Sequence, residues 1–420
     1  MKTGGSSPKA EPFFRVTLIA GEFPYPPNHG GRADMWTRIQ ALAERGVQIQ
    51  LICWSSELWG GRPQPEHLDV VRGVVHDLVV MHIPLGAKAL VRRLCLLPRW
   101  PSHVASRAPT AAQWRELWPR VQAFGPHGVF QDNLWGGALA ERLARQLGVP
   151  RWVRSHNIEF KYMQRQQALA RGLKQRLKLA ITCLGIERYE LHNLRTADAV
   201  YDISTDDLAY WRGRGVQRGQ WLPPIVRVPP VQAGAESRVH VLPPGCALYV
   251  GNLHTPNNVQ GLLWFLQQVW PHVLVQCPEA QVVLAGAHPH PDLQEAVAAT
   301  PGVTLLPNPP DVWPLYRQAA VLINPVLAGS GVNIKTTEML QLGVPIVSTP
   351  VGAGGLTPDV RAALQIADTP QVFADTLAQA LQGRITVPEA VSARARAVFR
   401  PEALDAVVAQ WRDTHLSKFR

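Results

Sequence analysis

The sequence lacks the features of a disulfide-stabilised or zinc-binding protein. Its cysteines are few, odd in number and far apart, and no pair has the Cys-x-x-Cys spacing of zinc and redox motifs. We therefore expect neither a disulfide framework nor a Cys-based metal site, and the usage indicates a reducing compartment. The five are Cys53, Cys95, Cys183, Cys246 and Cys277.

Long apolar runs are also missing. Of the 420 residues, 46% are hydrophobic and only 17% are charged, yet no run approaches the roughly 18 apolar residues of a membrane-spanning helix. This excludes an integral membrane protein, and the apolar content excludes a disordered chain. The apolar stretch at residues 12–21 superficially resembles a signal peptide, but Arg15 interrupts it. We expect a cytosolic protein with a short N-terminal leader.

The dinucleotide-binding fingerprint is absent as well. No Gly-x-Gly-x-x-Gly follows a strand, and no acidic residue follows the second strand where that motif requires one. No Asp-x-Asp stands where it would hold a metal, and Asp206 and Asp207, which follow Ser204, are expected to begin a helix that Ser204 caps. The sequence thus argues against a standard nicotinamide or flavin dinucleotide site.

What is present is an excess of positive charge in one half. The net charge is +11; up to Leu222 there are 30 Lys plus Arg against 18 Asp plus Glu, and from Pro223 onward 12 against 13. A one-sided excess indicates an anionic partner for the first half, which could be nucleic acid, acidic lipid or a phosphorylated substrate. Composition alone leaves these three open.

Short apolar runs alternate with segments of helical period through both halves. A proline-rich stretch at residues 222–245 interrupts the alternation, and such a stretch is typical of a linker. The alternation predicts an α/β fold of two Rossmann-like domains, each with a parallel sheet covered by helices, so ligands are expected beyond the carboxyl ends of the strands. We place the domains at 1–222 and 247–399, with a linker at 223–246. Strands are expected at 15–20, 48–53, 79–83, 129–132, 151–155, 200–203, 247–250, 281–285, 303–306, 321–323 and 346–348, and helices at 32–45, 136–146, about 159–194, 259–277, 291–300, 312–319 and 333–342.

The first candidate site is the loop after the first strand. Gly30 and Gly31 precede Arg32 where a helix begins, so backbone N–H groups and a cation could meet an anion there. The alternative is that the glycines only turn the chain. A second candidate follows the strand at 151–155, where Arg154, Ser155, His156, Asn157 and Glu159 crowd a strand end, although a lone histidine is more often structural.

The third candidate is the segment 321–356. Gly329 and Gly331 allow a ligand close to the backbone, and the N–H groups from Gly331 to Asn333 could face a diphosphate at the start of a helix. Lys335 adds a cation suited to phosphate, and Glu338, one turn later, could accept from the two hydroxyls of a ribose. The alternative is a capped helix whose Lys and Glu are solvated.

These residues resemble the retaining glycosyltransferases of family 4, which have the GT-B architecture of two Rossmann-like domains facing across a cleft. The similar segments are 26–32, 154–159, 248–266 and 329–340, and the pattern is especially like that of the branch acting in bacterial polysaccharide and cell-envelope assembly. The resemblance implies transfer of a sugar from a nucleotide-sugar donor to a glycan, lipid-linked or other acceptor, with retention of anomeric configuration. It also implies that the tail at about 400–420 packs back on the first, acceptor-binding domain.

The resemblance assigns roles to the candidate residues. Glu338 matches the ribose-binding glutamate, whereas Ser330 stands where the family has its first glutamate, and His156 matches the histidine beside the transferred sugar. His156, Lys335 and Glu338 are the expected catalytic residues. Gly30, Gly31 and Arg32 form the phosphate and acceptor loop, and the acceptor side adds Arg154, Asn157 and Glu159. The donor would be held by Gly251, Asn252, Asn257, Ser330, Gly331, Val332, Asn333, Lys335 and Glu338.

The mechanism that the resemblance implies needs neither a nucleophile nor a metal. No carboxylate nucleophile is evident, so the acceptor is expected to attack on the face from which the diphosphate leaves, without a metal or other cofactor. A GT-B nucleotide-sugar epimerase is a competing reading; it would need paired acid and base groups, for which the sequence offers His156 and Glu159.

Two basic tracts, at 88–107 and 161–178, account for much of the charge. In the second, Leu169, Leu173, Leu177, Ile181 and Leu184 recur at helical spacing among basic residues. Such a helix could be solvated and docked on its own domain, or it could contact anionic membrane at the inner face of the cytoplasmic membrane. A nucleic-acid-binding protein is the alternative from another class, but no zinc finger or other nucleic-acid-binding motif is present, so we expect no nucleic-acid partner.

Overall fold

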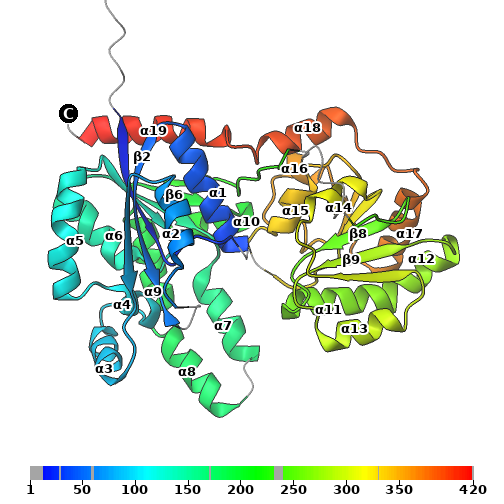
Figure 1. Ribbon diagram of the computed structural model, residues 1–420, viewed down its shortest axis with the longest axis horizontal. Coiled ribbons are helices and arrows are strands. Elements are labelled where there is room, and N and C mark those ends of the chain that lie inside the picture. Colours follow the sequence, from blue (N-terminus) through cyan, green and yellow to red (C-terminus); the bar gives the residue numbers. More distant parts are fainter. Residues whose placement is uncertain are drawn as a thin grey trace, which may run out of the picture. The chain divides into compact units, whose positions relative to one another are not determined.

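The computed structural model describes residues 13–27, 30–57, 61–169, 172–230, 240–329 and 331–418. The chain forms two compact units (Figure 1). Of the described residues, the first contains those in 13–155, 159–200 and 404–418, and the second those in 156–158 and 201–403. The first unit is therefore discontinuous, because its last segment follows the whole of the second.

The first unit is built on a seven-stranded sheet in the order β3-β2-β1-β4-β5-β6-β7. Buried, mostly apolar runs form its central strands, and β1 pairs in parallel with both β2 and β4. The strands are β1 (Phe14–Ala20), β2 (Val47–Ser55), β3 (Asp77–His82), β4 (Gly128–Asp132), β5 (Arg151–Ser155), β6 (Ala199–Asp202) and β7 (Gly219–Trp221). The six strands expected here are confirmed, and β7 was not expected.

Helices connect these strands. They are α1 (Gly30–Glu44), α2 (Pro65–Arg72), α3 (Ala87–Leu96), α4 (Ser102–Arg107), α5 (Ala111–Phe124), α6 (Gly137–Leu147), α7 (Glu159–Leu169), α8 (Leu173–Cys183), α9 (Ile186–Arg195) and α10 (Thr205–Gly213). As expected, Ser204 caps α10, because its hydroxyl accepts from Asp207 N at 3.1 Å. The single long helix expected at 159–194 is wrong: Gly172 (φ 90°) and Gly185 (φ 74°) lie in the left-handed region and separate it into α7, α8 and α9. In Figure 1, α7 and α8 form a hairpin that extends beyond the sheet of the first unit.

The second unit has a six-stranded sheet in the order β10-β9-β8-β11-β12-β13. Its register-defined pairs are all parallel. The strands are β8 (Ala247–Val250), β9 (Val282–Gly286), β10 (Val303–Pro307), β11 (Val321–Asn324), β12 (Ile346–Ser348) and β13 (Gln365–Ile366). Five of these match the expected strands, and the two-residue β13 was not expected.

Two helices of the second unit differ from the expected ones. The apolar stretch expected at 259–277 is helical, but a π-helical turn divides it, and the helix expected at 333–342 covers only six residues as α15. The helices are α11 (Pro256–Trp264), the π-helix η3 (Phe265–Val269), α12 (Trp270–Gln276), α13 (Pro291–Ala298), α14 (Trp313–Gln318), α15 (Ile334–Met339), α16 (Pro358–Arg361), α17 (Pro370–Leu381) and α18 (Glu389–Ala397).

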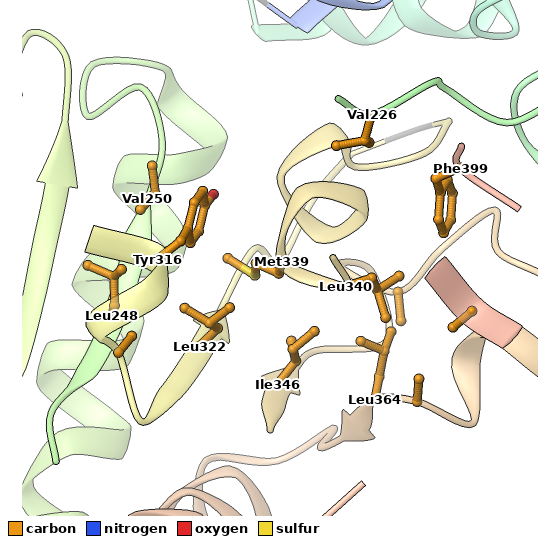
Figure 2. Close-up of a cluster of buried hydrophobic side chains, with 14 of the residues drawn as sticks. Val226, Leu248, Val250, Tyr316, Leu322, Met339, Leu340, Ile346, Leu364 and Phe399 are labelled. Atoms are coloured by element: carbon orange, nitrogen blue, oxygen red, sulfur yellow. The ribbon is translucent and has the colours of Figure 1, made fainter. Parts of the chain in front are cut away.

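Apolar side chains anchor α15 in the core of the second unit. Met339 and Leu340 are buried in a cluster with residues of β8, β11, β12 and α14 (Figure 2). Tyr316 of α14 belongs to the same cluster and is fully buried. Because close-packed interiors leave little freedom, this packing fixes the position of the polar residues on α15.

The C-terminal helix α19 (Ala403–Lys418) packs in the first unit. Its Trp411 stacks on Trp152 of β5, with ring centroids 4.6 Å apart and planes 8° apart, and both rings are buried. Arg45, the residue after α1, donates through Nε to Asp405 Oδ1 of α19 at 2.6 Å.

The predicted fold class, an α/β chain with two Rossmann-like domains, is confirmed by the two parallel sheets. No helix in the described ranges is long and apolar enough to cross a membrane.

Candidate functional site

The carboxyl ends of β8 and β11 are the natural ligand site of the second sheet. These two strands are neighbours, yet the chain leaves β8 toward β9 on one side and β11 toward β12 on the other. In open α/β sheets a ligand binds at such a reversal of strand order. The loop from Gly251 follows β8, and Pro325 follows β11, so the structure brings two of the sequence-predicted donor segments to this one point.

Two described residues lie just before α15. Gly331 has φ 69°, and Asn333 is the residue before the helix. Thr336 links α15 to the chain after β12 and to the end of β11, since its hydroxyl donates to Gly352 O at 2.7 Å and accepts from Asn324 Nδ2 at 2.8 Å. Val332 is buried, and Ser330 lies outside the described residues.

Lys335 is enclosed and bonded to two side chains from other elements. Its ammonium donates to Tyr249 Oη of β8 and to Asn258 Oδ1 of α11, both at 2.7 Å. Burial lowers the pKa of Lys335 to about 7, although the carboxylate of Glu338 opposes that change. The side chain is therefore poised between its charged and neutral forms near neutral pH, and an anion beside it would favour the charged form.

Glu338 faces a tyrosine from α14. Tyr316 Oη donates to Glu338 Oε2 at 3.3 Å, and Tyr316 is fully buried. Burial raises the pKa of Glu338, while Tyr316 and Lys335 act in the opposite direction. Lys335 and Glu338 are electrostatically coupled one turn apart, as the sequence predicts, and neither is simply solvated.

Asparagines shape the loop after β8. Asn252 Oδ1 accepts from His254 N at 2.9 Å and from Thr255 N at 3.1 Å, and Asn258 Nδ2 donates to Asn252 O at 2.8 Å. Asn258 thus joins this loop to Lys335. The sequence singled out its neighbour Asn257, which is half-buried. Asn258, Tyr249 and Tyr316 were missed, because no motif marks residues that meet only in the folded chain.

Glycine is required at two places in this region. A Cβ on Gly251 would lie 2.7 Å from Tyr249 Oη, the hydroxyl that holds Lys335. A Cβ on Gly331 would lie 2.9 Å from Asn157 Oδ1 and 3.0 Å from the carbonyl oxygen of His156, and residues 156–158 are grouped with the second unit. Gly331 therefore lies against residues 156 and 157 within the second unit.

Arg154 forms an ion pair inside the first unit. Its guanidinium is fully buried and donates to Asp34 Oδ2 at 3.1 Å. Arg38 also bonds Asp34 at 2.6 Å and Asp132 at 2.5 Å, so two arginines and two aspartates form one buried network at the carboxyl ends of β4 and β5. This network links α1 to the strand ends that precede His156.

The remaining first-unit candidates lie at helix starts. The backbone N–H groups of Glu159 and Phe160 donate to the Glu190 carboxylate at 2.8 and 3.1 Å, which satisfies the N-terminus of α7. Gly30 and Gly31 form the exposed first residues of α1. Arg32 pairs with Glu22 at 2.8 Å, which orients its guanidinium beside this loop.

In the parts of the chain that the structure describes, no group of three or more His, Cys, Asp or Glu side chains is placed to hold a metal ion. On α15 of the second unit the structure places one lysine and one glutamate together with hydroxyl and amide groups that bond to them. That set can bind an anion next to a polyol, with an ammonium for the anion and a carboxylate for the hydroxyls.

The chain is similar to several known proteins. It is 23% identical over 382 residues to an uncharacterised 44.6 kDa protein in the cps region of Klebsiella pneumoniae, covering 86% of this chain and 89% of that protein. Among solved structures it is similar to sucrose-phosphate synthase from Thermosynechococcus elongatus, with 18% identity, a TM-score of 0.61, and coverage of 96% of this chain and 99% of the other. It is also similar to HepE from Anabaena in complex with UDP and glucose, with 12% identity, a TM-score of 0.60, and coverage of 96% and 100%.

The family model described as glycosyl transferases group 1 matches residues 245–383. That range runs from the start of β8 to the end of α17, so it includes the reversal of strand order together with Lys335 and Glu338. The second unit of this protein thus contains a glycosyl transferases group 1 domain, in a chain whose fold is that of the GT-B glycosyltransferases.

Proposed function

We propose that this protein transfers a sugar from a nucleotide-sugar donor to a glycan or lipid-linked acceptor with retention of anomeric configuration, as a retaining glycosyltransferase of family 4. The observation that carries the proposal is the position of Lys335 and Glu338. Both lie on α15, beside the reversal of strand order, and within the matched range 245–383. A cation and a carboxylate one turn apart suit the diphosphate and the ribose of a nucleotide.

The proposed chemistry uses position and charge. Glu338 accepts from the ribose hydroxyls, with its carboxylate oriented by Tyr316. Lys335, with the backbone amides of residues 331–333, stabilises the negative charge that develops on the departing diphosphate. His156 lies beside the transferred sugar, and the acceptor hydroxyl attacks on the face that the diphosphate leaves. No protein nucleophile or metal takes part in this scheme.

The comparisons suggest which donors and acceptors to test first. HepE is described in complexes with UDP and with UDP-glucose, so uridine nucleotides are the first donors to try. The relative in the cps region of Klebsiella pneumoniae favours a role in bacterial polysaccharide or cell-envelope assembly. We place the enzyme in the cytoplasm at the inner face of the cytoplasmic membrane, in peripheral contact with anionic lipid.

A thermal-shift screen with UDP, GDP, dTDP and ADP tests the donor site. A nucleotide at 100 times its dissociation constant stabilises the protein by about 2.7 kcal/mol. Loss of a hydrogen bond to a charged group costs about 1.5–3 kcal/mol, so Glu338→Gln should weaken the stabilising nucleotide by roughly ten- to a hundredfold. Glu295→Gln is the matched control, because Glu295 is an exposed glutamate on α13 of the same unit.

Product analysis then tests the reaction. With an acceptor present, transfer yields a glycosylated product and free nucleoside diphosphate; an epimerase would convert the donor sugar without any acceptor. The rate should be unchanged by a chelator. Normal nucleotide binding and turnover in Glu338→Gln would show that the site is assigned wrongly.

A further inference from the structure

The excess charge of the chain lies in two short segments. Residues 84–107 contain five Lys or Arg and residues 161–184 contain six, and neither segment contains an Asp or Glu. Elsewhere 31 Lys plus Arg stand against 31 Asp plus Glu, so these two segments account for the whole net charge of +11. They contain the helices α3, α4 and α8 and most of α7.

The apolar stripe of α8 faces solvent. Leu173, Leu177, Ile181 and Leu184 recur at helical spacing and are 84%, 62%, 44% and 62% exposed. A helix docked on its own domain buries such a stripe in the core. Here the stripe is exposed. This argues against a helix docked on its own domain and favours the alternative, a helix that contacts anionic membrane.

Helix α3 has the same character. None of its residues is buried, and Leu90, Val91 and Leu94 are 55%, 60% and 48% exposed. Lys88, Arg92 and Arg93 stand among them. A helix with exposed leucines and only basic charges is the pattern of a segment that lies in a lipid interface.

Helix α4 joins these two helices. It contacts both α3 and α8, and Arg93 Nε of α3 donates to Ser102 Oγ of α4 at 2.6 Å. Three positive charges act on His103 of α4: Arg93 from α3, Arg107 from its own helix and Lys178 from α8. Burial and these charges lower the pKa of His103 to about 4. The cations of α3 and α8 therefore act on one common region of the first unit.

We propose that α3 and α8, held by α4, form a docking face for an anionic phospholipid membrane. The exposed leucines enter the apolar boundary, while the basic side chains around them contact lipid phosphates. Charge complementarity selects this occupant, because the two segments contain basic residues and no acid. Arg107 of α4 is buried and donates to Gly21 O, so it is not part of this face. The inference gives the membrane contact proposed above a specific surface, and it does not depend on the donor site.

Sedimentation of the full chain with lipid vesicles tests the proposal. At physiological salt the protein should bind phosphatidylcholine vesicles containing one third phosphatidylglycerol, and it should bind pure phosphatidylcholine vesicles far more weakly. Each of Leu173→Ser and Leu177→Ser should reduce binding by at least about tenfold. Each of Lys88→Gln and Arg176→Gln should reduce it by about fivefold, and higher salt should weaken binding further.

Matched controls come from the second unit. Val241 and Val275 are 86% and 82% exposed, and Arg384 is exposed, so Val241→Ser, Val275→Ser and Arg384→Gln test apolar area and charge elsewhere on the chain. These variants should bind vesicles like the parent protein. The thermal shift produced by the nucleotide should be the same in all variants, which keeps this test separate from that of the proposed function.

Three results would overturn the proposal. The first is no binding to the anionic vesicles at physiological salt. The second is equal loss of binding in the leucine variants and in the valine controls. The third is conversion of an oligomer to a monomer by Leu173→Ser with no change in vesicle binding, since α8 would then join copies of the chain.

Discussion

The ammonium of Lys335 should make nucleotide binding depend on pH. In the free protein its pKa is about 7, and a bound diphosphate would raise that value by stabilising the charged form. Above pH 7 the free protein gives up a proton that the complex retains. The dissociation constant of the nucleotide should therefore rise by up to tenfold per pH unit as the pH increases from 7 toward the pKa of the complex.

Tyr249→Phe should move the pH at which the nucleotide begins to bind more weakly, and the size of the shift can be calculated. Tyr249 Oη accepts from Lys335 Nζ at 2.7 Å, and a hydrogen bond to a charged group contributes about 1.5–3 kcal/mol. The lower figure corresponds to about one pKa unit. The pKa of Lys335 should fall to about 6, so that at pH 7 the charged fraction drops from about one half to about one tenth.

Calorimetric titration of the nucleotide at several pH values measures the effect. Tyr249→Phe should bind about tenfold more weakly than the parent at pH 8 and nearly as tightly at pH 5.5. Asn258→Asp is the opposite perturbation: a carboxylate in place of the amide oxygen that lies 2.7 Å from Nζ should raise the pKa of Lys335 by about one unit or more. Its affinity should start to decline at a higher pH than that of the parent.

Two results would refute this reasoning. If the parent affinity were flat from pH 6.5 to pH 8.5, Lys335 would not meet the diphosphate. If Tyr249→Phe weakened binding by the same factor at every pH, Tyr249 would only support the local structure. Titration of the nucleotide's own phosphate is common to the three proteins and cancels in the comparison.

Two further predictions concern stability. Because Lys335 has a pKa near 7 when folded and the ordinary lysine value of 10.5 when unfolded, its charge destabilises the folded state by about 1.4 kcal/mol more for each unit that the pH falls from 10.5 to 7. Lys335→Met should thus raise the melting temperature without ligand more at pH 7 than at pH 9.5, and calorimetry showing the reverse order would contradict this. Arg154→Met should lower the free energy of unfolding by about 3 kcal/mol in urea, because it removes a buried guanidinium that pairs with the buried carboxylate of Asp34. An unchanged urea midpoint would mean that the buried network contributes little.

The sequence predicts the central strands well because each is a short apolar run that ends at polar residues or glycine. All eleven expected strands are present, whereas the edge strands β7 and β13, with three and two residues, are not buried throughout and leave no apolar run to recognise. Helices are located less well. Apolar spacing continues through Gly172 and Gly185, so the periodicity does not reveal that the chain changes direction there.

For the site, the sequence reveals spacing within an element but not contacts between elements. Lys335 and Glu338 are recognisable because they lie three residues apart on one helix. Their partners are Tyr249 and Asn258 for the lysine and Tyr316 for the glutamate, which are 86, 77 and 22 residues away in the chain. Only the parallel sheet, which brings the ends of β8 and β11 to one edge, makes these contacts possible.

The return of α19 to the first unit determines when that unit can be completed during synthesis. Trp152 is made early, but its stacking partner Trp411 is made only after the whole second unit. At roughly 5–20 residues synthesised per second, the interval is on the order of ten to fifty seconds. During this interval the surface of the first unit that binds α19 stays exposed. The second unit comes almost entirely from one continuous segment, so it can fold first. The domain whose synthesis begins first is the last to be finished.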